Sequence, residues 1–333
     1  MNTVTNPDIL LQVNDLKMYF PLTNDFFGKP KAYVKAVDGI SFSVERGTTF
    51  GLVGESGCGK TTTGKCILGI NQCTAGEIIY KGRAISSTKN KNKRKLRSIQ
   101  LVFQDPYGSL DPRQTARSII LEAIVADGKK HDGESNKARV KELLSLVELG
   151  EEIETRFPHE MSGGQRQRLC IARALACNPD LIVCDEAVSA LDVSIQAQII
   201  NLFERLQRQL GLTYIFISHD LAVVKHIADK IAVMYLGRIV EIMSAEKLYS
   251  NPLHPYTKAL LSAVPTTDYY AERKRERIVL KGEVPSLINV PSGCPFHPRC
   301  PYATDLCKTK VPGLRQVLPD GHQVACHYPL INE

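Results

Sequence analysis

One stretch of sequence decides the fold: Gly54-Glu55-Ser56-Gly57-Cys58-Gly59-Lys60-Thr61. It fits the pattern G-x-x-x-x-G-K-[ST] and lies between a buried apolar run, residues 49–53, and a helix expected over 62–70. Glycines let successive backbone N–H groups turn toward phosphate oxygens, and a helix N-terminus adds partial positive charge. The pattern predicts a nucleoside triphosphate site, with Lys60 on the β- and γ-phosphates and the Thr61 hydroxyl on Mg²⁺.

Strand-like and helix-like patterns alternate on both sides of this stretch. Apolar runs of strand length recur at 99–103, 181–184, 214–217 and 231–235. Apolar residues at helical spacing occupy 140–147 and 195–210. Strands separated by helices predict an α/β fold with a largely parallel sheet.

Composition excludes several classes of protein. The chain has 333 residues, of which 43% are hydrophobic and 23% charged, which is typical of a globular protein. No window approaches 18 consecutive apolar residues, and the first residues lack a signal-peptide pattern, so we expect a cytoplasmic location. The net charge is 42 − 35 = +7, and residues 86–98 form a basic run. That run is a solvated surface loop or a contact for nucleic acid or lipid headgroups.

A hydrophobic strand over 181–184 ends in two acids, Asp185 and Glu186. Acids at the carboxyl end of a buried parallel strand lie at the ligand edge of the sheet. We expect Asp185 to hold Mg²⁺, through water, and Glu186 to orient or deprotonate the attacking water. Solvated acids at a strand end are the alternative.

A second helix start has the features of an anion site. Ser162 is a good N-cap, and Gly163 and Gly164 expose backbone N–H groups at the start of a helix expected to end near Ala176. In isolation, a capped Ser-Gly-Gly turn is the alternative.

Taken together, these motifs resemble an ABC-type ATPase cassette over about residues 10–250. Gln104 and the run Ser189-Ala190-Leu191-Asp192 complete the family's order. The resemblance implies a P-loop fold with a mixed sheet core and a helical subdomain at about 106–178, and it implies catalytic roles for Glu186, Gln104 and His219. It implies Mg²⁺ ligands Thr61, Gln104 and Asp185. The nucleotide set implied by motif and resemblance is Tyr19, Phe20 (adenine stacking), Gly54, Glu55, Ser56, Gly57, Cys58, Gly59, Lys60, Thr61, Thr62, Ser162, Gly163, Gly164, Gln165 and Asp192.

One position departs from the family. Its members usually carry proline after the catalytic glutamate, and this chain has Ala187. Without proline, the backbone that aims Glu186 is expected to be looser.

From residue 251 onward, prolines become frequent and regular periodicity fades, which predicts a small irregular domain over 251–333 after a cassette over 1–250. Residues 251–261 and 291–301 resemble the C-terminal region of oligopeptide and dipeptide import ATPases. That resemblance implies a second, related ATPase subunit, two transmembrane permeases and an extracytoplasmic peptide-binding protein as partners, at the cytoplasmic face of the membrane. Nickel importers share this architecture, so the cargo stays open.

Four late cysteines follow the spacing C-x5-C-x6-C-x18-C: Cys294, Cys300, Cys307 and Cys326. Four thiolates suit a [4Fe-4S] cluster or Zn²⁺, with free thiols as the third alternative and His297, His322 and His327 as nearby ligands. The resemblance favours the [4Fe-4S] cluster, because some members of the family hold one in this region.

Two functions remain to be weighed. The first is an ATP-hydrolysing motor for import of di- or oligopeptides, with ATP and Mg²⁺ and without a nucleic-acid partner. The second is an ABC ATPase acting on nucleic acid or the ribosome, suggested by the +7 charge and the basic run.

Overall fold

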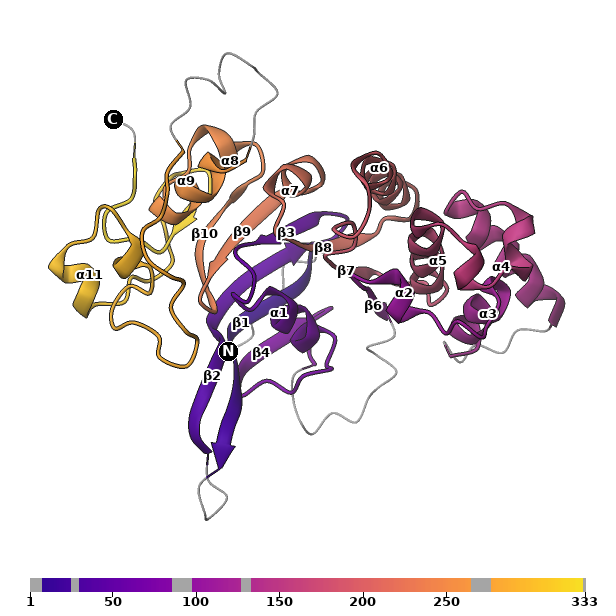
Figure 1. Ribbon diagram of the computed structural model, residues 1–333, viewed down its shortest axis with the longest axis horizontal. Helices are drawn as coiled ribbons and strands as arrows, with labels where there is room; N and C mark the ends of the chain where they lie inside the picture. The colour runs from indigo at the N-terminus through magenta and orange to yellow at the C-terminus, as the bar shows by residue number, and fades with distance from the viewer. Residues whose placement is uncertain (1–7, 25–29, 86–97, 127–132, 265–276, 332–333) are drawn as a thin grey trace. The chain divides into compact units, whose positions relative to one another are not determined.

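The computed structural model describes residues 8–24, 30–85, 98–126, 133–264 and 277–331, and it divides into two compact units (Figure 1). Unit 1 comprises residues 1–44, 50–88 and 218–333, and unit 2 comprises residues 45–49 and 89–217. Residues 86–97 of the basic run lie outside the described residues.

Unit 1 contains an antiparallel sheet built from two long strands. β1 (Ile9–Asn24) lies between β2 (Pro30–Glu45) and β4 (Ala75–Tyr80), and β5 (Arg83–Ala84) completes the order β2-β1-β4-β5. In β1, alternate residues are buried, with Leu11 and Val13 on the inner face. Residues 40–45, in which apolar and polar side chains alternate, form the end of β2.

The second sheet of unit 1 is mixed. β3 (Thr49–Val53) pairs in parallel with β9 (Lys230–Tyr235), and β10 (Arg238–Ser244) pairs with β9 in the antiparallel sense. β12 (Gln323–Val324) and β11 (Arg315–Gln316) follow β10. The helices of this unit are α1 (Lys60–Ile67), α7 (Leu221–Ile227), α8 (Lys247–Ser250), α9 (Pro255–Ser262) and α11 (Asp305–Thr309), with the short 3-10 helix η4 (His297–Arg299).

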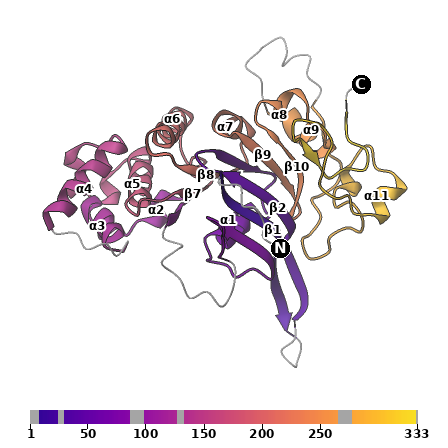
Figure 2. The ribbon, with the colours of Figure 1, turned by 180° about the vertical axis from the view of Figure 1, so that it is seen from behind.

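The C-terminal residues of unit 1 attach to β10 through a buried carboxylate. Glu241 is fully buried and accepts hydrogen bonds from the backbone N–H groups of Leu253 (2.6 Å) and His254 (3.0 Å). Its Oε1 also pairs with His322 Nε2 at 2.8 Å. Figure 2 shows the resulting arrangement, with α9 and the C-terminal segment beside β10. A polar anchor therefore ties the proline-rich region to the strand.

Unit 2 has a parallel sheet in the order β6-β7-β8: β6 (Ile99–Val102), β7 (Leu181–Asp185) and β8 (Thr213–Ser218). The buried residues of β7 and β8 explain their continuous apolar sequences. The helical elements are α2 (Pro106–Ser109), α3 (Ala116–Ala126), α4 (Gly133–Leu146), η2 (Glu151–Thr155), η3 (Pro158–Glu160), α5 (Gly163–Leu175) and α6 (Val193–Leu210). The predicted fold class, a mixed sheet with added helices, is confirmed. The strands predicted at 49–53, 99–103, 181–184, 214–217 and 231–235 all form.

Candidate functional site

The phosphate loop connects β3 to α1, as the motif predicts, and its glycines are required by close packing. Gly54 (φ 151°) and Gly59 (φ 107°) adopt backbone conformations that L side chains rarely reach. A Cβ atom on Gly54 would lie 2.2 Å from the Met234 carbonyl oxygen, and one on Gly59 would lie 2.1 Å from the Ala36 carbonyl oxygen. The loop is thus fitted against β9 and β2 at two points.

Lys60 lies in the first turn of α1 and is almost fully buried. Its ammonium donates to the carbonyl oxygens of Gly54 (2.8 Å) and Glu55 (3.0 Å). The positive charge is therefore held inside the curve of the loop, where a phosphate would meet it. Burial raises the pKa of the neighbouring Cys58 thiol despite the nearby lysine, so this thiol stays protonated near neutral pH.

A chain of backbone contacts fixes the far side of the loop. The Gly237 N–H donates to the Cys58 carbonyl (2.9 Å), and the Asp38 N–H donates to the Gly237 carbonyl (2.8 Å). The Asp38 carboxylate in turn accepts from the Arg238 guanidinium at 2.6 Å. The β9–β10 turn therefore supports the phosphate loop.

Phe20, with Tyr19 beside it, is the residue expected to stack on adenine. The Tyr19 hydroxyl donates to Asp38, whereas Phe20 is exposed. Burial and the Asp38 carboxylate raise the pKa of Tyr19 to about 12. Burial opposes ionisation of Asp38, but Tyr19 and Arg238 outweigh it and hold the pKa of this carboxyl below its usual value. Because Tyr19 is already engaged, Phe20 is the better candidate for stacking.

His219 lies in unit 1, directly after β8. It is exposed and precedes α7, whose N-cap Asp220 accepts from the backbone N–H groups of Ala222 and Val223. This cap fixes the turn that carries His219. Its predicted contact with the γ-phosphate stays a prediction.

In unit 2, the structure brings Gln104 and Glu186 together. Gln104 follows β6 and Glu186 follows β7, and these strands are parallel neighbours with Val102 opposite Cys184. The Gln104 Nε2 donates to Glu186 Oε2 at 2.8 Å. Two residues that are 82 positions apart in sequence thus meet at the carboxyl edge of the sheet, where Glu186 is expected from its position after a buried strand.

The backbone of Glu186 is fixed without a proline after it. Glu186 has φ 51°, a conformation that L residues seldom adopt. Its N–H donates to the Ile217 carbonyl (2.9 Å), and its own carbonyl accepts from the Ser189 N–H (3.1 Å) and hydroxyl (3.0 Å). Ala187 is buried. Hydrogen bonds therefore hold Glu186 from both sides, and the effect of Ala187 on this backbone stays a prediction.

Ser162 caps α5 through a reciprocal pair of hydrogen bonds. The Gln165 N–H donates to Ser162 Oγ (3.3 Å), and the Ser162 N–H donates to Gln165 Oε1 (3.0 Å). Ser162 and Gly163 remain exposed on the surface of unit 2. The start of α5 is therefore capped and exposed to solvent. A helix N-terminus that binds the phosphates of a partner's nucleotide would need both features.

The run Ser189–Asp192 precedes α6. Asp192 is the N-cap residue, and its carbonyl accepts from the Gln196 N–H (2.8 Å). Ser189, Ala190 and Asp192 are exposed, and the following Val193 is 83% exposed.

The predicted Mg²⁺ ligands lie in both units, Thr61 in unit 1 and Gln104 and Asp185 in unit 2, and their shared binding of the ion stays a prediction. Thr61 offers a hydroxyl and Asp185 a carboxylate, and oxygen atoms are the ligands that Mg²⁺ prefers. Gln104 uses its Nε2 on Glu186, which leaves its Oε1 as the acceptor for a cation.

The prediction of an iron–sulfur cluster at Cys294, Cys300, Cys307 and Cys326 is wrong. All four cysteines line one small apolar pocket with Phe296, Tyr302 and Tyr328. Within the described part of the chain, however, no three or more His, Cys, Asp or Glu residues are placed to hold a metal ion. Burial raises the pKa of Cys294 and of Cys326 to about 11, so both are thiols rather than thiolates near neutral pH. Free thiols, the third alternative, match these observations.

Two family models match separate parts of the chain. Residues 37–189 match the ABC transporter family, and residues 240–307 match the family described as oligopeptide/dipeptide transporter, C-terminal region. The chain is 52% identical to the oligopeptide transport ATP-binding protein AppF of Bacillus subtilis over 98% of this chain and 99% of that protein. It is 49% identical to the dipeptide transport ATP-binding protein DppF of Haemophilus influenzae, with the same coverage.

This chain belongs to the ABC transporter ATP-binding family. Solved relatives include cbiO1 from Clostridium perfringens, with TM-score 0.62, 27% identity, and coverage of 73% of this chain and 91% of that one. A dimeric bacterial ABC transporter cassette, MJ0796, matches with TM-score 0.63, 25% identity, and coverage of 71% and 99%. The predicted ABC ATPase is therefore confirmed, and the names of these ATP-binding relatives favour the transport motor over the nucleic-acid alternative. No helix among the described residues is long and apolar enough to cross a membrane.

Sequence reasoning missed two residues that contact the phosphate loop from beyond position 250. The Tyr256 hydroxyl accepts from the Glu55 N–H, and the Arg299 guanidinium pairs with the Glu55 carboxylate. Both lie in stretches, 251–261 and 291–301, that the sequence singled out only as marks of a family. Nothing in their spacing indicated contact with Glu55.

Proposed function

We propose that this chain is the ATP-hydrolysing motor subunit of an importer for di- or oligopeptides. The observation that carries the proposal is similarity over nearly the whole chain to proteins named for oligopeptide and dipeptide transport. The match at 240–307 to a family region named for such transporters adds to it, because that region lies outside the matched cassette at 37–189.

Within this proposal each half of the site has its own task. The phosphate loop binds the triphosphate through inward N–H groups, and Lys60 neutralises charge on the β- and γ-phosphates. Glu186, oriented by Gln104, takes the proton of the attacking water. His219 contacts the γ-phosphate, and Phe20 stacks on adenine. Thr61, Asp185 and Gln104 would hold Mg²⁺, which would neutralise further phosphate charge.

We infer that a second cassette completes the nucleotide site, because the start of α5 at Ser162–Gln165 is exposed. Its free surface supplies N–H donors to the partner's nucleotide, and Asp192 lies in the loop that crosses the interface. The dimeric form of the solved MJ0796 cassette supports this arrangement. We propose a second, related ATPase as that partner, with two permease subunits and a peptide-binding protein, at the cytoplasmic face of the membrane.

Reconstitution tests the proposed cargo. The chain, its partner ATPase and the two permeases in vesicles should hydrolyse ATP faster when a peptide-loaded binding protein is added. The same vesicles carrying Lys60→Ala should show no stimulation. Stimulation by a nickel-loaded binding protein and not by a peptide-loaded one would replace the peptide with nickel as cargo. Unchanged hydrolysis with every loaded binding protein would contradict the transport proposal.

A further inference from the structure

The C-terminal region of unit 1 contacts the phosphate loop through a paired charge. Arg299 is the last residue of the 3-10 helix η4. Its guanidinium makes a bidentate ion pair with the Glu55 carboxylate, in which Nη1 donates to Oε2 at 2.9 Å and Nη2 donates to Oε1 at 3.2 Å. The Arg299 side chain is only 8% exposed and that of Glu55 26%. A two-pronged pair that is largely shielded from water is geometrically specific and weakly screened by salt.

A second contact reaches the same residue of the loop. The Tyr256 hydroxyl, on α9, accepts from the Glu55 backbone N–H at 3.0 Å. Tyr256 is fully buried and packs against Tyr235 and Phe296, with ring centroids 4.7 and 5.4 Å away. The Arg299 guanidinium lies over the Tyr235 ring, 5.9 Å from its centroid. An aromatic cluster therefore places both partners of Glu55.

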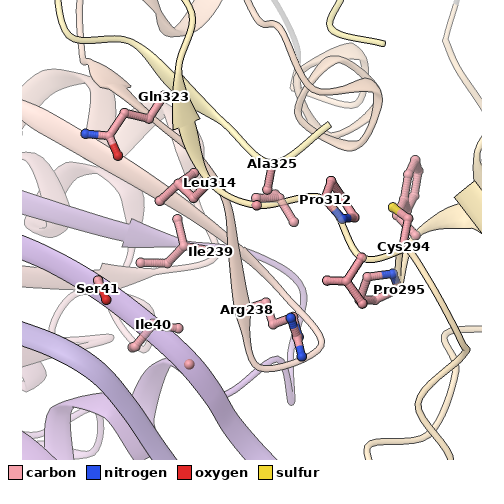
Figure 3. A pocket seen from close by; sticks show the side chains of 15 residues that line it. Ile40, Ser41, Arg238, Ile239, Cys294, Pro295, Pro312, Leu314, Gln323 and Ala325 are labelled. Atoms are coloured by element: carbon pink, nitrogen blue, oxygen red, sulfur yellow. The ribbon is translucent and has the colours of Figure 1, made fainter. Parts of the chain in front are cut away.

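These contacts are local. Cys294 and Pro295, a few residues before Arg299, border an open pocket of about 350 Å³ that Arg238 and Pro312 also line (Figure 3). This pocket separates the segment around Cys294 from Arg238, whereas Arg299 contacts the phosphate loop directly. Tyr256 and Arg299 thus both contact the phosphate loop at the same residue, Glu55.

Glu55 raises an electrostatic problem that Arg299 solves. A carboxylate within a loop that receives a triphosphate would repel it, because like charges a few ångströms apart and partly shielded from water interact strongly. Arg299 cancels this charge and turns both carboxylate oxygens toward itself. The Glu55 N–H donates to Tyr256, so residues beyond position 250 hold both the side chain and the backbone of Glu55.

We propose that Arg299 is a positioning residue for nucleotide binding, which neutralises and orients Glu55 so that the phosphate loop accepts the triphosphate. The C-terminal region is then part of the support of the ATP site in addition to any role toward transport partners. The inference rests on the nucleotide site proposed above and is independent of the cargo.

A double-mutant cycle on the full chain tests it. Arg299→Met keeps the apolar stem over Tyr235 and removes the charge, so a fluorescent ADP analogue should bind roughly tenfold more weakly, a defect that shrinks as salt is raised. Adding Glu55→Gln to Arg299→Met should restore most of the affinity, because the unpaired carboxylate is gone. Glu55→Gln alone should bind more tightly than Arg299→Met, because no unpaired carboxylate then remains in the loop. Arg315→Met, an exposed residue of the same region with the same change in net charge, is the matched control and should bind normally.

Three outcomes would overturn the inference: unchanged affinity in Arg299→Met, no recovery in the double variant, or binding by Glu55→Gln alone that is as weak as that by Arg299→Met. A merely structural role of Arg299 would lower the melting temperature of the single and double variants alike without recovery of binding. Lys60→Ala in the same assay distinguishes failure of the proposed nucleotide site from failure of the role of Arg299. If Lys60→Ala binds nucleotide normally, the proposed nucleotide site is wrong. If Lys60→Ala loses binding while Arg299→Met binds normally, only the proposed role of Arg299 is wrong.

Discussion

The phosphate loop of unit 1 is supported by residues scattered along the chain, whereas Glu186 of unit 2 is held by residues at the ends of neighbouring strands. Met234, Gly237, Tyr256 and Arg299 all contact the loop from more than 170 positions away. Glu186 depends on Gln104, Ile217 and its own turn at Ser189. The first arrangement makes nucleotide binding sensitive to the C-terminal region, and the second keeps the proposed base tied to the sheet edge.

Glu186→Gln should have the largest effect and should separate the two regions. The amide cannot accept the proton of the attacking water, so we expect ATP turnover to fall by about 10²–10⁴-fold, the range of general-base catalysis. Nucleotide affinity should stay within a factor of a few, because unit 1 is untouched, and ATP should hold the two cassettes in a closed dimer. Steady-state hydrolysis and size-exclusion chromatography with ATP measure both effects. Normal turnover would show that Glu186 is not the base.

Lys60→Ala should have the opposite signature. Removing a charged donor to phosphate costs about 1.5–3 kcal/mol, or roughly 10- to 100-fold in affinity. The affinity for ATP, measured by titration calorimetry, should therefore fall by this factor. Lys65, an exposed residue of the same helix, provides a control: Lys65→Ala should bind normally. Normal binding by Lys60→Ala would refute the phosphate-loop assignment.

The anchor of the C-terminal region predicts a pH effect. His254 is fully buried, and burial lowers its pKa to about 4 although Glu241 opposes the shift. A folded pKa below the unfolded value means that the unfolded chain binds the extra proton, so stability falls as pH drops below about 6.5. The loss attributable to this group should reach roughly 3 kcal/mol near pH 4.

His254→Asn is the variant that isolates this effect. Asparagine can still cap α9, where the His254 Nδ1 accepts from the Tyr256 N–H, but it does not titrate. Melting temperatures of the two proteins should run parallel above pH 7, and the unmodified protein should decline more steeply toward pH 4. Identical slopes over the whole range would show that His254 does not set the acid stability of this region.

The contrast between the regions also explains what could be predicted from sequence. The Gly54–Thr61 pattern, the acids after 181–184 and the cap at Ser162 follow from short-range chemistry, and they formed where expected. The Arg299–Glu55 pair joins positions 244 residues apart, and no periodicity records such a contact. The cysteine spacing suggested a metal, but spacing does not fix where sulfur atoms point or how burial holds their protons.

Substitutions of Ser162 should have the smallest effect, and they distinguish its role as the cap of α5 from a role in binding the partner cassette's nucleotide. Ser162→Ala removes the cap of α5 and should destabilise unit 2 by about 1 kcal/mol. Ser162→Asn keeps an N-cap acceptor, so its melting temperature should match that of the unmodified chain. If Ser162 serves only as a cap, the asparagine variant should also hydrolyse ATP normally. If the helix start binds the partner cassette's nucleotide, the larger side chain should lower turnover in the assembled dimer while stability and single-chain nucleotide binding stay unchanged. Since a cap and an anion site use the same exposed serine, only this split between stability and turnover distinguishes local support in unit 2 from a site completed by a second chain.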